Sequence, residues 1–227
     1  MDSLIRKFWW TGGNDKDRYM ALIKWDSLCC PKAMGGLGFR KMEHMNSALL
    51  AKLAWQVATD FDTPWVKCFK AKYCRRNSFW SVESKGYDSA TWKGILHARE
   101  IIRNGSITLV GSGADVDIWE QPWIPWLNYE EFSCLMREVR VRSRLLSSVA
   151  DISSPNGDWN RQRVLEIFGN DIGSRICEIQ RLPILNSDML IWKHSGDGEF
   201  SVKGALNVCS NINDHDAGID SKLWKFI

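Results

Sequence analysis

The strongest periodic pattern in this chain is a run of apolar residues at helical spacing over residues 42–59. Met42, Met45, Leu49, Leu53 and Val57 recur every three or four residues, and the charged side chains of this segment fall elsewhere. A helix with one apolar stripe must bury that stripe against a neighbouring element. The pattern therefore predicts a long amphipathic helix inside a helical packing unit.

Two further helices are expected after this one. Pro64 starts the first of them, because proline is well tolerated at the first helical position, where an N–H would have no partner. Ser89 is expected to cap the second, because its hydroxyl can accept a hydrogen bond from the first turn. Residues 15–103 should thus form a unit of at least three helices. The side chains expected to be buried together are Leu49, Leu53, Trp65, Phe69 and Trp92.

An elbow of proline and glycine is expected before the long helix. A helix is predicted over residues 19–28, and Pro31 ends it because proline lacks an N–H and clashes with the preceding turn. Three glycines follow within residues 35–38, and their tolerance of positive φ predicts a tight turn that buries Leu37 and Phe39. A phosphate-binding glycine loop is the alternative, but the spacing matches neither common pattern of such loops.

The second half of the chain has a different character from about residue 104. Residues 107–119 and 188–200 each resemble a β-hairpin, with two short β-rich runs around a glycine turn. Residues 128–157 are expected to be rich in loops. Short helices are expected at residues 161–168, 172–179 and 202–208. The predicted fold class is α+β, with a mainly helical N-terminal unit (1–103) and a small β-hairpin and short-helix region (104–227).

Charge is distributed unevenly along the 227 residues, although the net charge is only +3. Residues 1–103 hold 18 Lys and Arg against 10 Asp and Glu, a net charge of +8, and residues 104–227 carry the remaining −5. An anionic partner is therefore expected on the first half.

The odd number of scattered cysteines, seven, argues against a disulfide framework. Without a signal peptide or membrane-spanning run, an intracellular location is expected, in the nucleus or cytoplasm.

A cluster of basic residues around one aromatic ring is the candidate binding site. Basic and aromatic side chains in alternation suit phosphate contacts and base stacking, so RNA or DNA is the expected partner. The alternative is a solvated helix face whose lysine stems cover apolar surface. The candidate residues are Lys67, Lys70, Lys72, Tyr73, Arg75 and Arg76.

Several segments resemble plant LINE-type (non-LTR) retrotransposon reverse transcriptases, in the region that follows the polymerase domain. The same region occurs in plant chains named “putative ribonuclease H protein”. The resemblance runs in order from about Phe8 to Trp224. Its segments are Phe8-Trp9-Trp10, residues 25–29, 35–39, 46–55, 69–73 and 91–96, Arg99-Glu100, and residues 198–203. It implies a connector between the reverse transcriptase domain and the zinc-binding and ribonuclease H regions of a polyprotein.

Catalytic chemistry is not expected from this chain alone. The sequence has no Asp-Asp pair, which the polymerase turn needs to hold two metal ions. Neither the adjacent Cys29 and Cys30 nor the scattered histidines have the spacing of a zinc site. No cofactor or metal is therefore expected. The predicted role is a non-catalytic connector that binds RNA or DNA weakly, and the alternative is an orphan or remnant helical protein-interaction module without a nucleic-acid role.

Overall fold

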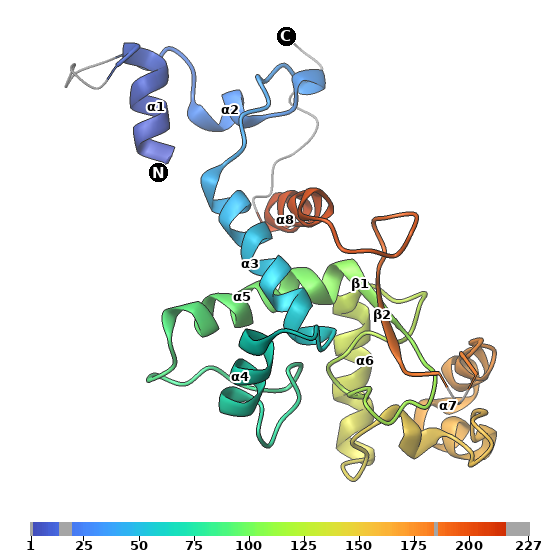
Figure 1. The fold of residues 1–227 in the computed structure, drawn as a ribbon. Coiled ribbons are helices and arrows are strands. Elements are labelled where there is room, and N and C mark those ends of the chain that lie inside the picture. The colour runs from blue at the N-terminus through green and yellow to red at the C-terminus, as the bar shows by residue number, and fades with distance from the viewer. Residues whose placement is uncertain (1, 14–19, 184–185, 217–227) are drawn as a thin grey trace.

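The computed structural model describes residues 2–13, 20–183 and 186–216 and confirms an α+β fold, in which helices predominate (Figure 1). Two strands form one small antiparallel sheet. The α-helices are α1 (Asp2–Thr11), α2 (Trp25–Cys29), α3 (Met42–Ala58), α4 (Pro64–Tyr73), α5 (Ala90–Gly105), α6 (Tyr129–Arg142), α7 (Arg161–Cys177) and α8 (Val202–Asp216). The strands are β1 (Ser106–Leu109) and β2 (Met189–Trp192), and two 3₁₀ turns span Lys32–Met34 and Val149–Ile152.

Helix α3 forms where the periodic pattern predicts it, but its buried face is made of small residues. Ala48, Ala51, Ala54 and Val57 are fully buried against α5 and α8, while Leu49 is half exposed. The prediction that Leu49 is buried is therefore wrong. Helices α5 and α8 pack on the alanine face, which explains the difference, because alanine lets a neighbouring helix approach closely. Large side chains on the alanine face would hold these helices away from α3.

The other residues of the predicted helical core do pack together. Leu53, Trp65 and Phe69 pack against the core cluster that contains the buried Trp92, and the Phe69 and Trp92 ring centroids are 5.9 Å apart. Pro64 occupies the first turn of α4, and the Ser89 hydroxyl accepts a hydrogen bond from the Trp92 N–H, so both predicted helix starts are confirmed. Helix α8, near the other end of the chain, also joins this core by packing on α3 and α5.

The two predicted hairpins are wrong, because β1 and β2 pair with each other instead. Ser106 lies opposite Trp192, and Leu109 lies opposite Met189. The Asp188 carboxylate explains why the glycine loop after β1 does not fold back as a hairpin turn. It accepts hydrogen bonds from the N–H groups of Gly111 and Gly113 at 2.7 and 2.8 Å. Each predicted hairpin therefore contributes one strand to a sheet that joins distant parts of the sequence.

A second hydrophobic cluster lies around helices α6 and α7. The sequence did not lead us to expect α6. Residues 129–142 form the helix α6 within a region predicted to be rich in loops. Asn128 caps it by accepting a hydrogen bond from the Glu131 N–H, while the Glu131 carboxylate accepts one from the Asn128 N–H. Phe132, Met136 and Val139 are buried on one face. Helix α7 bends at Gly169, so the two short helices predicted there are confirmed as its two halves.

The N-terminal region departs from the predicted helix over residues 19–28. Helix α2 covers only Trp25–Cys29, Tyr19 lies outside the described residues, and Met20 and Ile23 are exposed outside any helix. The turn after Pro31 is present, with positive φ at Gly35 and Gly38, and Phe39 stacks on Trp25. Leu37 is 44% exposed, so the prediction that this turn buries it is wrong.

Candidate nucleic-acid interface

Helix α4 carries the candidate residues because it packs through only one of its faces. Val66 is buried, and Trp65 and Phe69 pack against the aromatic core around Trp92. The basic side chains are consequently carried on the parts of the helix that this packing leaves in solvent. The five basic residues and Tyr73 thus come from one helix and the two residues after its C-cap.

The N-terminal part of this cluster is neutralised by a neighbouring turn. Lys67 forms an ion pair with Asp62, and Lys70 forms one with Asp60. Both acids lie in the short connection between α3 and α4, and Asp60 has a positive φ of 54°. Positive charge on Lys67 and Lys70 is therefore offset within a few ångströms, which weakens their attraction for phosphate.

The C-terminal part of the cluster has a different environment. Lys72, Arg75 and Arg76 are exposed, and within the described residues no Asp or Glu forms an ion pair with any of them. The Arg75 Nε donates a hydrogen bond to the Ala71 carbonyl at 2.9 Å, which leaves the rest of its guanidinium to solvent. These three cations, here called the α4 exit cluster, form the uncompensated part of the predicted site.

Tyr73 packs partly against the hydrophobic core. Its ring stacks on Trp92 with centroids 4.6 Å apart and an angle of 6° between the planes. The phenol donates a hydrogen bond to the Ser89 hydroxyl at 3.1 Å, and the Lys72 ammonium lies 4.8 Å from the ring centroid. The contact with Ser89, followed by that with Lys72, lowers the pKa of the Tyr73 phenol. A nucleic-acid base could stack on Tyr73 only at the ring face that Trp92 does not cover.

Two residues next to the α4 exit cluster did not emerge from the sequence analysis. Lys85 and Tyr87 lie in the connection between α4 and α5, where they line a hollow of about 120 Å³ together with Lys72 and Tyr73. Tyr87 is 83% exposed. The sequence did carry a signal, since Lys85 and Tyr87, two positions apart, follow the basic cluster about ten residues later.

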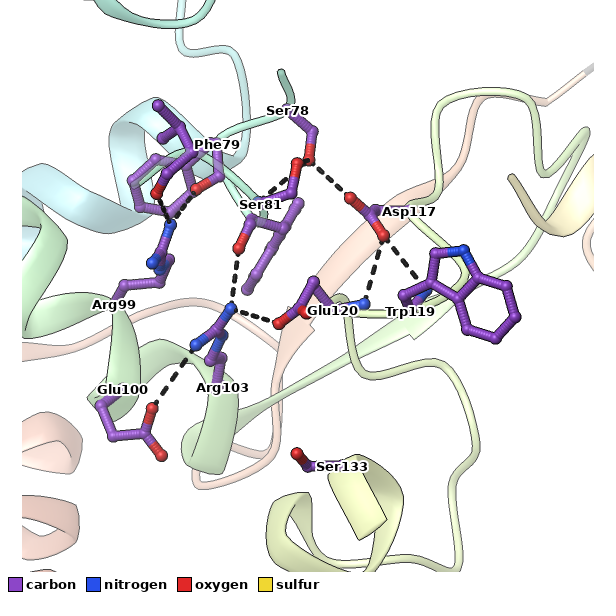
Figure 2. A network of polar contacts seen from close by, with 12 residues as sticks. Ser78, Phe79, Ser81, Arg99, Glu100, Arg103, Asp117, Trp119, Glu120 and Ser133 are labelled. Atoms are coloured by element: carbon purple, nitrogen blue, oxygen red, sulfur yellow. Dashed lines mark hydrogen bonds and ion pairs between the residues drawn. The ribbon is translucent and has the colours of Figure 1, made fainter. Parts of the chain in front are cut away.

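Other basic residues of the first half serve the fold and are not available to a partner. Arg99 donates hydrogen bonds to the carbonyls of Phe79 and Val82 at 2.7 and 2.8 Å, and burial lowers the pKa of its guanidinium. Arg103 donates to the Trp80 carbonyl and to the Glu120 carboxylate at 2.7 and 2.8 Å (Figure 2). The two arginines thus fix the connection between α4 and α5. The net charge of +8 of residues 1–103 therefore overstates how much positive charge this half exposes on its surface.

Metal-ligating side chains lie apart from one another in the described part of the chain. Within this part, no group of three His, Cys, Asp or Glu side chains is arranged to hold a metal ion. All seven cysteines lie in the described ranges and are free thiols. Over the same ranges, none of the helices has the length and apolar character required to span a bilayer.

Comparison with curated proteins finds two relatives from Arabidopsis thaliana. The first is named “Putative ribonuclease H protein” and is 28% identical over 233 residues, covering 99% of this chain and 37% of the relative. The second is named “Uncharacterized mitochondrial protein” and is 30% identical over 125 residues, covering 55% of this chain and 80% of the relative. No family model matches the chain, and no solved structure matches it.

These relatives place the chain in a plant retrotransposon-related family. In particular, it belongs to the same family as the mitochondrial protein, of which it covers four fifths. The chain spans little more than a third of the length of the ribonuclease H relative.

Proposed function

We propose that this chain is a connector segment of a LINE-type retrotransposon polyprotein, located between the reverse transcriptase domain and the zinc-binding module. The parent activity is RNA-directed DNA polymerisation. The segment itself catalyses no reaction and binds RNA or DNA weakly, without sequence preference. The alignment supports a segment of a longer protein, since nearly the whole chain matches a part of the ribonuclease H relative.

The α4 exit cluster is the observation that carries the binding proposal. Lys72, Arg75 and Arg76 are exposed cations without an acidic partner among the described residues. Cations of this kind bind phosphates by displacing condensed counterions, and such binding does not depend on base sequence. A small cluster neutralises few phosphates, so the expected affinity is weak and should fall with salt at a slope of only about −2, at about 0.7 for each of three contacts.

A salt series tests this proposal directly. Fluorescence anisotropy of a labelled single strand should show binding at low salt and a linear fall of log affinity with log salt concentration. Changing Lys67, Lys70, Lys72, Arg75 and Arg76 together to Gln should reduce that slope by at least about 2, because each lost phosphate contact contributes about 0.7 on a single strand. Circular dichroism of the variant should remain unchanged, because exposed charges contribute little to stability.

The alternative function is a helical protein-interaction module without a nucleic-acid role. The specific observation in its favour is the exposed apolar surface of α1, where Leu4, Phe8 and Trp9 are 47–63% exposed. The same salt series separates the two functions. Absence of binding at low salt, or a slope that the five changes leave unaltered, would remove the nucleic-acid proposal and leave the interaction module.

A further inference from the structure

Tyr87 is an exposed aromatic residue on a loop that is well fixed. The Lys85 N–H donates a hydrogen bond to the Asp88 carboxylate at 2.7 Å, and the Asp88 N–H donates one to the Lys85 carbonyl at 3.1 Å. The Lys93 ammonium donates to the Gly86 carbonyl at 2.7 Å. Tyr87 nevertheless remains 83% exposed, so the folded loop holds an aromatic ring in the solvent.

The hollow beside this ring combines aromatic walls with cations. Tyr73, Tyr87 and Trp92 line it, as do the lysines at positions 72 and 85. The Lys85 ammonium lies 5.9 Å from the Tyr87 ring centroid, and the Lys72 ammonium lies 4.8 Å from that of Tyr73. The Lys72 and Lys85 ammonium groups therefore each lie over one face of a tyrosine ring, so a base can stack on Tyr87 only at the opposite face.

The acidic residues of the hollow indicate which part of a nucleotide would enter. Glu83 and Asp88 also line it, and the Asp88 carboxylate is already engaged by the Lys85 N–H. Because a carboxylate repels phosphate, the hollow itself suits an uncharged ring, while phosphates suit the lysines at its rim. A single-stranded nucleic acid presents both groups side by side, since its bases are not held in a duplex.

We propose that Tyr87 is a stacking platform for one base of a single-stranded RNA or DNA, with the neighbouring phosphates held by Lys72 and Lys85. This inference rests on the proposed nucleic-acid binding and assigns it a base-contacting residue. Every base has a flat aromatic face, so the stacking adds affinity without sequence preference. The site also extends the α4 exit cluster toward the start of α5, because Lys72 belongs to both.

An abasic strand separates the stacking from the phosphate contacts. Anisotropy at about 50 mM salt would compare a labelled oligothymidylate of about twelve nucleotides with an abasic strand of equal length. The unmodified protein should bind the base-bearing strand about tenfold more tightly. Tyr87→Leu should abolish this preference while leaving the affinity for the abasic strand unchanged, and Tyr87→Trp should retain it.

Phe61→Leu is the matched control, because Phe61 is also an exposed aromatic residue, at 54%, but it lies between Asp60 and Asp62 and outside the hollow. This variant should keep the preference for bases. If the protein binds both strands equally, or if Tyr87→Leu keeps the preference, the stacking inference is wrong while the salt-dependent phosphate binding stands. If neither strand binds at low salt, the inference and the proposed function fail together.

Discussion

The two ends of the basic cluster at helix α4 carry similar side chains in opposite electrostatic settings. Lys67 and Lys70, its N-terminal members, pair with Asp62 and Asp60. The α4 exit cluster that follows has no such partners among the described residues. The number of basic residues in a segment therefore does not measure its attraction for phosphate, because nearby acidic residues decide how much of that charge acts outside the protein.

Arg99 and Arg103 are cations of a third kind, because their guanidinium groups bind backbone carbonyls inside the fold. Their guanidinium groups satisfy carbonyls of residues 79–82, and Arg103 also pairs with Glu120. Arginine suits this task because its planar group donates several hydrogen bonds in a fixed geometry. The molecule thus uses its basic residues in three ways, namely as internal donors, in surface ion pairs and as uncompensated surface charge.

The largest expected effect is the loss of an internal arginine. Arg99→Met keeps an apolar stem but leaves the carbonyls of Phe79 and Val82 without this donor, which should lower the free energy of unfolding by about 2–4 kcal/mol. Arg76→Gln, a surface control with the same change in charge, should cost less than about 0.5 kcal/mol. Urea unfolding followed by tryptophan fluorescence measures both. Equal losses in the two variants would contradict the distinction between internal and surface cations.

A smaller effect is expected when the acids beside α4 are neutralised. Asp60→Asn with Asp62→Asn removes the partners of Lys67 and Lys70, so these lysines become available to phosphate. The salt slope of single-strand binding should rise by up to about 1.4, at about 0.7 for each added phosphate contact. As a control, changing Glu130 and Glu131 in the first turn of α6 to Gln removes the same charge from a different part of the molecule. An equal rise in both variants would mean that net charge alone controls the binding.

Local signals in the sequence were sufficient to predict the helices that pack around Trp92. Pro64 and Ser89 act within one helical turn, so the starts of α4 and α5 could be predicted. The same kind of signal was present at Asn128 and Glu131 and was overlooked, although Phe132, Met136 and Val139 add a helical stripe. The exposed position of Leu49 was not predictable from periodicity, because the approach of α5 favours alanine over leucine on the buried face.

Contacts between distant residues explain the remaining errors. The pairing of β1 with β2 brings together residues 80 to 86 positions apart, and the glycine loop is held by Asp188 and Arg181 from the far end of that stretch. No local pattern encodes such partners.

For the candidate site, Asp60 and Asp62 are close enough in sequence to suggest ion pairs with Lys67 and Lys70. The carbonyl partners of Arg99 lie 17 and 20 residues away and could not be foreseen.

The most direct test of the central claim compares two variants that remove the same charge from the two ends of the basic cluster at α4. One changes Arg75 and Arg76 to Gln, and the other changes Lys67 and Lys70 to Gln. In a salt series with a labelled single strand, the arginine variant should lose about 1.4 from the slope, because two phosphate contacts are lost. The lysine variant should lose less than about 0.5, since its cations are already paired. Equal losses, or a larger loss in the lysine variant, would contradict the account.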